Sequence, residues 1–505
     1  MSILNSIASW LMKKRMHQIE LFIKYPFDVQ QEWLQQLLRE GSKTEFGRLF
    51  NMEHITNYDQ FSAQIPLQDY EQLKPYITLM QQGSQNLLWP GEIQWFAKSS
   101  GTTDKSKFLP VSTESLENCH YKAGMDMVTL YCSNYPETKL FTGKNLALGG
   151  SLKSHRSGTF TSLQGDVSAI IIQHLPFWAE YFRAPDRSIA LMDEWSEKLE
   201  HMAQQMCREN VTSLAGVPSW MLVLLNRVLE VRQSKELCEV WPDLEVYFHG
   251  GVGFTPYREH FDRINGFKPL RYLQVYNASE GFFGIQDQRD ANDMLLMLDY
   301  GIFYEFQEVM GHHSTKVSPV VPLSGVKLHT DYALIITTNA GLWRYQIGDI
   351  VRFTSLHPYR IIISGRTKQY LNVFGEELMI HNTDEAMAYA CQKTHSRIRE
   401  YTVAPIYMSQ HSGAHEWLIE FDKAPEHPSY FMSLVDQFLK SNNSDYEAKR
   451  YNDFVLSFPK LQILSENTFL KWLKSKHKLG GQHKVPRLSN TRTMAEELLN
   501  ISTCK

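Results

Sequence analysis

The stretch KSSGTTDKSKFLP, residues 98–110, places hydroxyl side chains, a glycine and three lysines next to one another. Backbone N–H groups of a glycine-containing turn, with hydroxyls and a lysine nearby, can surround the oxygens of a phosphate. A Walker A loop needs glycine directly before a lysine that precedes serine or threonine, but Lys107 lies between Ser106 and Phe108. The stretch therefore predicts either a phosphate-binding loop of another kind or a polar surface turn.

A second segment, VYNASEGFFG at 275–284, reads as a strand followed by a polar turn. Its Glu280 places a carboxylate in that turn. Upstream, HGGVGF places Gly250 and Gly251 at a strand end, where the backbone can approach a flat base closely. Taken alone, a turn of this kind is more often structural than functional.

A third segment, WRYQIGDIVRF at 343–353, reads as one arm of a hairpin. A carboxylate held on such a strand, here Asp349, can accept hydrogen bonds from two neighbouring hydroxyls. The adjacent His312 and His313 lack the spacing of helical metal ligands, and neither H-E-x-x-H nor G-x-S-x-G occurs. Zinc-protease and serine-hydrolase chemistry are therefore disfavoured.

The elements that must position these segments change in type along the chain. The first 90 residues read as mainly helical, with a capping box at Asp28 and Gln31 and a helical run that ends at Gly41. From about residue 140, short apolar strands alternate with amphipathic helices: SAIII (168–172) and LEVYFHGG (244–251) as strands and 216–231 as a helix. This alternation predicts an α/β domain with helices that cover a sheet.

The remaining chain predicts two further kinds of structure. Residues 331–365 read as successive antiparallel strands joined by tight turns. Beyond them, three helices (383–394, 427–440 and 466–477) and the strands YTVAPIYM and EWLIEF describe a small α+β domain.

Bulk composition excludes several classes of protein. The 505 residues exceed the usual size of one domain, and 43% hydrophobic residues with a formal net charge of -4 are typical of a folded soluble chain. This charge gives no field for nucleic acids, and no apolar run is long enough to span a bilayer. Six scattered cysteines without a C-x-x-C pair fit a reducing cytoplasm, where we expect the protein.

The ordered segments resemble the motifs of the adenylate-forming enzymes, the superfamily of acyl-CoA synthetases, peptide-synthetase adenylation domains and luciferases. SSGTT is similar to the phosphate-binding loop of that superfamily, YNASEG to its aromatic-G-x-T-E motif, WRYQIGD to its Y-R-x-G-D motif and SGRTKQYLNVFGEEL to its hinge. The resemblance implies that the chain binds ATP and Mg²⁺. The residues that would bind the phosphates are Ser99, Ser100, Gly101, Thr102, Thr103, Lys107 and Ser279. Those that would contact the base and the rest of the nucleotide are Gly250, Gly251, Tyr276, Asn277 and Arg366. Asp349 would bind the ribose, and Glu280 would bind the metal.

Two segments resemble the auxin-responsive-promoter (Gretchen Hagen type) acyl-acid amido synthetases, including bacterial members. They are the segment from TEFGRLFN to LLWPGEIQWFAKSSGTT and the segment GGQHKVPR near the C-terminal end. This resemblance implies a large adenylation domain (1–365) and a smaller mobile cap domain (366–505). It also implies ATP-dependent joining of a carboxylic acid to an amine, usually an amino acid. An acyl-CoA ligase and a non-catalytic nucleotide-binding regulator remain the alternatives.

Three further expectations concern the small domain, the hinge and the pocket for the acid. Lys484, between Gly480-Gly481 and Pro486, would reach the cleft on a short constrained loop and act with Lys107 in adenylation. Gln369 occupies the position where the superfamily often has an acidic hinge residue. The pocket for the acid should be apolar, with candidates in 168–183, in GVPSWM and at Phe282 and Phe283.

Overall fold

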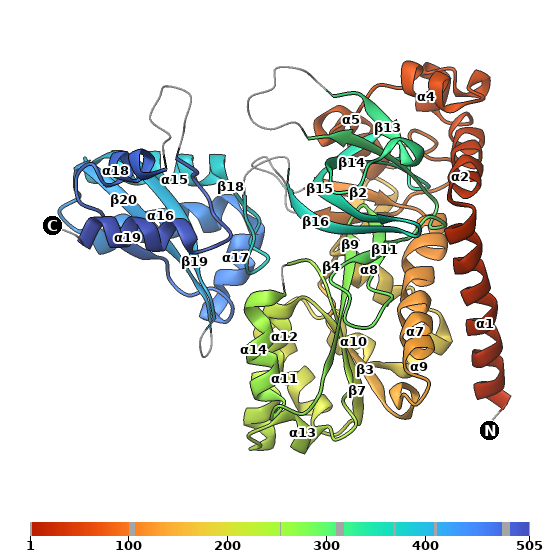
Figure 1. Ribbon diagram of the computed structural model, residues 1–505, viewed down its shortest axis with the longest axis horizontal. Helices are drawn as coiled ribbons and strands as arrows, with labels where there is room; N and C mark the ends of the chain where they lie inside the picture. Colours follow the sequence, from red (N-terminus) through yellow and green to blue (C-terminus); the bar gives the residue numbers. More distant parts are fainter. Residues whose placement is uncertain are drawn as a thin grey trace.

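The computed structural model describes residues 3–99, 107–252, 254–309, 318–366, 370–408, 412–476 and 485–503. A large N-terminal domain and a smaller C-terminal domain lie side by side, and helix α1 (Ile3–Lys24) runs along the far edge of the large domain (Figure 1). Both domains mix helices with sheets. This arrangement confirms the predicted α/β class with a large and a small part.

The N-terminal segment is helical, as predicted, in the helices α1, α2 (Pro26–Gly41), α3 (Glu45–Leu49), α4 (Tyr58–Gln64) and α5 (Tyr70–Gln81). The predicted capping box at Asp28 and Gln31 is wrong, because α2 begins two residues earlier with Pro26 in its first turn. A proline there has its ring φ preset for the helix and loses no intrahelical hydrogen bond. A capping box does form at Asp69 and Gln72, at the start of α5.

One twelve-stranded sheet crosses the large domain. Its strands, in spatial order, are β13 (Val320–Pro322), β12 (Ile302–Glu308), β14 (Asp331–Thr338), β15 (Tyr345–Leu356), β16 (Tyr359–Arg366), β11 (Met294–Leu296), β10 (Gly281–Ile285), β9 (Arg271–Ala278), β8 (Val246–His249), β7 (Val211–Gly216), β3 (Lys144–Ala147) and β6 (Arg183–Ala184). Strands β13 to β9 pair antiparallel, and β9 to β6 pair parallel. The sheet thus joins the predicted antiparallel region to the predicted α/β region.

Burial differs between the parallel and the antiparallel half of the sheet, because helices cover the two halves differently. Every residue of β8 is buried, as in parallel strands that helices cover on both faces, whereas burial alternates along β15. The helices around the parallel strands are α7 (Lys122–Asn134), α9 (Phe177–Phe182), α10 (Arg187–Ala190), α11 (Trp195–Met206), α12 (Pro218–Arg232), α13 (Leu237–Val240) and α14 (Thr255–Ile264). Helices α11, α12 and α14 pack on one face and α7 on the other (Figure 1).

The predicted strand at 168–172 is wrong: Val167–Gln173 forms the helix α8, whose backbone turns begin at Asp166. A short run of isoleucines favours a strand by local propensity but cannot be distinguished from a buried helical turn by its pattern. Ala169, Ile170 and Ile172 are buried, so tertiary packing determines the helix.

A second sheet of four strands carries the phosphate-loop candidate. Its strands, in spatial order, are β2 (Lys107–Val111), β1 (Trp95–Ser99), β5 (Phe160–Gly165) and β4 (Leu152–Ser157). After β2 the chain enters α6 (Thr113–Ser115) and a π-helical stretch, Leu116–Tyr121, that continues into α7.

The small domain contains the predicted helices and strands. Its elements are β17 (Tyr370–Leu371), β18 (Leu378–Met379), α15 (Ile380–Thr394), β19 (Arg397–Ile406), β20 (Ala414–Lys423), α16 (Pro428–Asn442), α17 (Ser444–Arg450), β21 (Lys460–Ile463), α18 (Thr468–Ser475) and α19 (Thr493–Thr503). Strands β19, β20 and β21 form a sheet. Helix α17 lies on the side that faces the large domain (Figure 1). The domain boundary at residue 366 stays a prediction; it falls on the last residue of β16.

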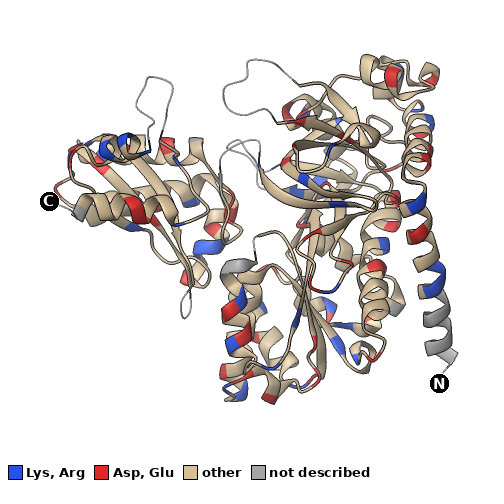
Figure 2. Ribbon diagram, in the orientation of Figure 1, with Lys and Arg blue, Asp and Glu red and all other residues tan. Residues whose placement is uncertain are grey.

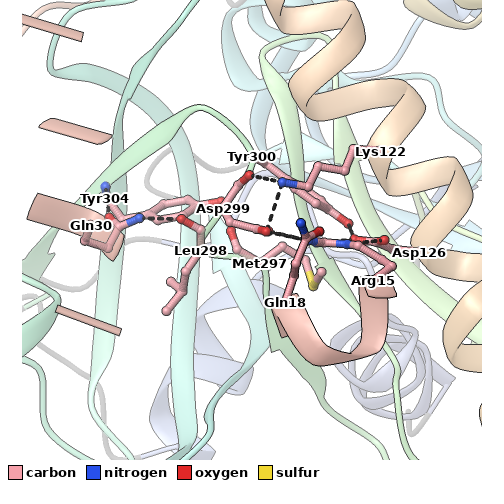
Figure 3. A network of polar contacts seen from close by, with 10 residues as sticks. All are labelled: Arg15, Gln18, Gln30, Lys122, Asp126, Met297, Leu298, Asp299, Tyr300 and Tyr304. Atoms are coloured by element: carbon pink, nitrogen blue, oxygen red, sulfur yellow. Dashed lines mark hydrogen bonds and ion pairs between the residues drawn. The ribbon is translucent and has the colours of Figure 1, made fainter. Parts of the chain in front are cut away.

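A buried ionic network fastens α1 to the core of the large domain (Figure 3). The Arg15 guanidinium donates to both oxygens of Asp126 at 2.7 and 2.6 Å and to Asp299 at 2.5 and 2.9 Å, and Tyr300 donates to Asp126 at 2.7 Å. Lys122 adds an ion pair with Asp299 at 2.9 Å. Because the side chains of Arg15 and Asp126 are almost fully buried, each charge depends on the other.

The charged residues of the chain are mixed in sign. Figure 2 shows Lys and Arg interspersed with Asp and Glu along the helices of both domains. Within the described ranges, no helix is both long enough and apolar enough to span a lipid bilayer.

Candidate active site

A cleft of about 3400 Å³ is lined by residues of both domains. It collects all the predicted site residues that belong to the described part of the chain, although these residues come from five separate segments. They are Ser99, Lys107, Gly250, Gly251, Tyr276, Asn277, Ser279, Glu280, Asp349 and Arg366. The cleft is therefore the candidate active site.

The phosphate-loop candidate connects β1 to β2. Ser99 is the last residue of β1 and pairs with Lys107, the first residue of β2. The Lys107 Nζ lies 5.7 Å from the centre of the Tyr70 ring. The Tyr70 hydroxyl accepts a hydrogen bond from the backbone N–H of Phe108 at 2.9 Å. Ser100, Gly101, Thr102 and Thr103 lie outside the described residues.

Glu280 lies in the turn between β9 and β10 and faces the cleft. Burial raises the pKa of its carboxyl from 4.5 to about 7, and Lys107 opposes this rise. A carboxylate that is costly to ionise on its own gains from a nearby cation, so its chemistry fits a metal ion. Cys119 holds the start of β10, because its sulfur accepts a hydrogen bond from the Phe282 N–H at 3.1 Å.

Asp349 connects the sheet to the small domain. Its carboxylate accepts a hydrogen bond from the Tyr276 hydroxyl at 2.6 Å and forms an ion pair with the Arg366 Nε at 2.6 Å. The register of β15 and β16 explains the second contact, since Asp349 lies directly opposite Arg366. Arg366 also lies 3.8 Å from the carboxylate of Glu377 in the small domain.

The two glycines follow β8, at the carboxyl end of the parallel strands, where open α/β sheets bind ligands. A side chain at Gly250 would collide with its neighbours, since a Cβ there would lie 2.7 Å from Asn277 Oδ1 and from Val275 O. Gly251 has φ +83, a conformation that favours glycine. The structure thus favours glycine at both positions, and the lack of side chains there would let the backbone approach a ligand closely.

The apolar candidates for the acid pocket separate into two groups. Ile171, Leu175, Trp220 and Phe282 line the cleft. Phe283 is fully buried and packs edge-on against Tyr276 with ring centres 4.8 Å apart, so it belongs to the core.

Lys484 and Gln369 lie outside the described residues, so their predicted roles stay predictions. Beside Trp220, three further residues line the far part of the cleft and were not predicted from the sequence: Trp195, Lys198 and Lys449. They match no motif, and only the packing of the two domains brings Lys449 to the other two.

Solved structures with a similar fold include an acyl acid amido synthetase and a CoA ligase. The GH3.15 acyl acid amido synthetase aligns with a TM-score of 0.60 and 18% identity, covering 97% of this chain and 95% of that one. A 2-hydroxyisobutyryl-CoA ligase in complex with 2-HIB-AMP and CoA aligns with a TM-score of 0.57 and 13% identity, covering 94% and 93%. At these identities the likeness establishes the fold.

Sequence comparison gives the family. The GH3 family N-terminal domain matches residues 15–270, which is half of the chain, the central domain matches 295–366 and the C-terminal domain matches 381–493. The chain therefore belongs to the GH3 family. Indole-3-acetic acid-amido synthetase GH3.3 of Arabidopsis thaliana is 22% identical over 541 residues, which cover 91% of this chain and 89% of the relative.

Proposed function

We propose that this protein is an ATP-dependent acyl-acid amido synthetase, which adenylates a carboxylic acid and transfers the acyl group to an amine. The observation that carries the proposal is the convergence of the predicted nucleotide-binding segments on one cleft between the two domains. The names of the relatives, an indole-3-acetic acid-amido synthetase and an acyl acid amido synthetase, support the same reaction type.

The first half-reaction forms a mixed anhydride. An oxygen of the substrate carboxylate attacks the α-phosphorus of ATP, and the bond to the bridging oxygen breaks, so pyrophosphate leaves with the electron pair. Lys107 and the backbone of the loop after Ser99 would bind the triphosphate and offset the charge that develops on pyrophosphate. In this role, Lys107 acts on the phosphates and leaves recognition of the acid to the apolar wall of the cleft.

Magnesium fits the residues present. Mg²⁺ in such sites commonly uses one or two carboxylates together with substrate phosphates, and Glu280 supplies one carboxylate in the cleft. No cluster of three acidic, histidine or cysteine side chains that could hold an ion without a nucleotide occurs in the described ranges. Glu280 would therefore hold the ion jointly with the triphosphate, and the ion would neutralise phosphate charge.

Asp349 would bind the ribose hydroxyls, and Tyr276 the base. In this structure the Asp349 carboxylate is held by Tyr276 and Arg366, which keep it oriented in the cleft. The ribose hydroxyls would then donate to the same two carboxylate oxygens of Asp349, beside or in place of these donors. We also assign Lys484 to the first half-reaction, and residues 366–505 to a cap domain that changes orientation before the second.

In the second half-reaction the amine nitrogen attacks the acyl carbon, the bond from that carbon to the phosphate oxygen breaks, and AMP leaves. The amine loses one proton to form the amide. The substrates are thus a small carboxylic acid and a small amine, and we expect the reaction in the cytoplasm.

An acid library tests the proposal. The parent protein with ATP and Mg²⁺ should release pyrophosphate only when a matching acid is present, and addition of amino acids should give an amide. Formation of a thioester with coenzyme A would instead make the protein an acyl-CoA ligase. Binding of ATP without release of pyrophosphate across the library would make it a non-catalytic nucleotide binder.

A further inference from the structure

The far part of the cleft contains a tryptophan–lysine cluster, formed by Trp195 and Lys198 of α11, Trp220 of α12 and Lys449 of α17. The rings of Trp195 and Trp220 pack edge to face with centres 4.0 Å apart. The Lys449 Nζ lies 4.7 Å from the centre of the Trp220 ring, so a lysine of the small domain packs on the large domain. Apart from Trp220, a candidate for the apolar wall of the acid pocket, the proposed reaction so far assigns no role to these side chains.

The two lysines of the cluster differ in their partners. The Lys198 Nζ donates to the carbonyls of Gly149 at 2.6 Å and Gly150 at 3.0 Å, so its charge is hydrogen-bonded and holds that turn. Lys449 is only 9% exposed as a residue, and it lines the cleft, where its Nζ makes no hydrogen bond or ion pair with any described residue. An ammonium that lines a cleft without a fixed acceptor can bind an anionic group of a ligand.

A second donor in the cluster also lacks an acceptor. The Trp195 Nε1–H is buried and has no hydrogen-bond partner within the described ranges. A carboxylate has two oxygens and can accept from an indole N–H and an ammonium at once. A buried N–H without an acceptor and a cleft-lining ammonium without a fixed acceptor therefore indicate a ligand that brings acceptor oxygens.

Carboxylates surround the same place. Asp166, Glu377 and Asp445 line the cleft, and together with Glu376 they attract the Lys449 charge at longer range. Burial nevertheless lowers the pKa of Lys449, because these carboxylates do not replace a direct partner. A ligand with several negative charges, such as the phosphates of coenzyme A, would be repelled by them, whereas a zwitterion offers an ammonium to the carboxylates and a carboxylate to the lysine.

We propose that Lys449 and the Trp195 indole N–H bind the carboxylate of the amine acceptor, so that this part of the cleft selects α-amino acids. The inference rests on the proposed amide-forming reaction and adds the residues that choose the acceptor. Because Lys449 belongs to the small domain, the acceptor site is complete only when α17 is docked on α12, as it is here. Lys449 acts as a specificity-determining residue and takes no part in adenylation.

The test compares an amino acid with its α-carboxamide, which lacks the negative charge but retains the attacking amine. In the parent, the amino acid should have the higher kcat/KM. In Lys449→Met, which keeps an unbranched side chain of similar length, kcat/KM for the amino acid should fall by about ten- to a hundredfold, the size expected for a charged hydrogen bond, while the carboxamide changes little. Lys449→Arg should restore part of the preference.

Two further variants guard against a folding defect. Trp195→Phe removes the indole N–H, keeps an aromatic ring beside Trp220 and lies in the other domain, so it should weaken the same preference in the same direction. Lys471→Met, at an exposed position of α18 in the small domain, should leave the preference unchanged. Binding of amino acids to the parent, followed by tryptophan fluorescence, should show a change that Lys449→Met loses.

The outcomes separate the two proposals. Equal losses for amino acid and carboxamide in Lys449→Met, or a matching loss of acid-dependent pyrophosphate release, would overturn the acceptor site while the amide-forming function stands. Absence of pyrophosphate release from the parent with every acid would instead contradict the proposed function, and amino-acid binding that is the same in parent and Lys449→Met would contradict the acceptor site on its own.

Discussion

Asp349 is the single residue whose loss we expect to weaken ATP binding most. Asp349→Ala should reduce the binding free energy by about 1.5–3 kcal/mol, the usual contribution of hydrogen bonds to a charged group, because the ribose hydroxyls lose their acceptor. Isothermal titration of ATP measures this change.

A matched control is Asp331→Ala. Asp331 lies on the neighbouring strand β14 and pairs with Arg352 at 2.6 Å, but it does not line the cleft. It should bind ATP like the parent. Unchanged affinity in a folded Asp349→Ala protein would remove Asp349 from the nucleotide site.

Glu280 predicts a pH dependence for magnesium. Its pKa is raised from 4.5 to about 7. Between these pH values the folded protein retains a proton that the unfolded chain has lost. The contribution of Glu280 to stability therefore falls as pH rises through this range. Magnesium needs the ionised carboxylate, and its apparent affinity with ATP should therefore rise up to about pH 7 and then level off.

Glu280→Gln should remove this pH dependence and raise the magnesium requirement by roughly tenfold. Titration of Mg²⁺ in the pyrophosphate assay at several pH values measures both effects. A variant with the parental magnesium curve and an altered choice of acid would place Glu280 at the acid instead.

The sequence predicted residues that line one cleft, but not the contacts that hold them. Ser99, Glu280 and Asp349 could be placed together because motif order carries information about the fold. The contact from Tyr276 to Asp349 could not be predicted, since it depends on side-chain packing between β9 and β15.

Among the elements, helix α1 should depend on Arg15 for its attachment. Arg15→Met leaves Asp126 buried with an uncompensated charge, so the free energy of unfolding should fall by about 3–5 kcal/mol. Urea unfolding followed by circular dichroism measures it. Arg39→Met, at an exposed position of α2, serves as the control and should change the free energy of unfolding by less than about 0.5 kcal/mol.

A loss in Arg15→Met no larger than that of the Arg39 control would mean that apolar packing alone holds α1. The buried network could not have been predicted from sequence, because Arg15 lies 284 residues from Asp299. The error at α8 has a related cause: the isoleucines at 170–172 favour a strand locally, and only the packing of the folded domain makes them helical. Elements with long or strictly alternating patterns, such as α12 and β15, were predicted correctly.

In the whole molecule, we expect the small domain to take part in both half-reactions. Lys484→Ala should lower acyl adenylate formation by about a hundredfold or more, as when a group that stabilises transition-state charge is removed. It should leave aminolysis of supplied acyl adenylate nearly unchanged. Rapid-quench measurement of each half-reaction separates the two.

Lys474→Ala, at an exposed position of α18, is the matched control for Lys484→Ala and should leave both half-reactions at parental rates. Equal losses in both half-reactions, or none, would show that Lys484 does not serve adenylation specifically.

Contacts between the domains were beyond sequence reasoning. The Tyr451 hydroxyl donates to Glu194 at 2.5 Å, and the Ser219 hydroxyl to the Phe374 carbonyl at 2.9 Å, so the small domain is docked by scattered residues without a motif. The proposed acceptor site at Lys449 would form only where the domains are docked in this way, so no motif marks it. The proposed nucleotide site, by contrast, lies on segments that motifs mark in the sequence.

The fate of the carboxylate oxygen distinguishes adenylation of the acid from its phosphorylation. An accepted acid labelled with ¹⁸O in both carboxylate oxygens should be converted to amide with the parent protein, ATP and an amino acid, and the AMP should then be analysed by mass spectrometry. Attack on the α-phosphate predicts one ¹⁸O in AMP and none in pyrophosphate. Label in inorganic phosphate, with ADP as the nucleotide product, would show an acyl phosphate and contradict adenylation.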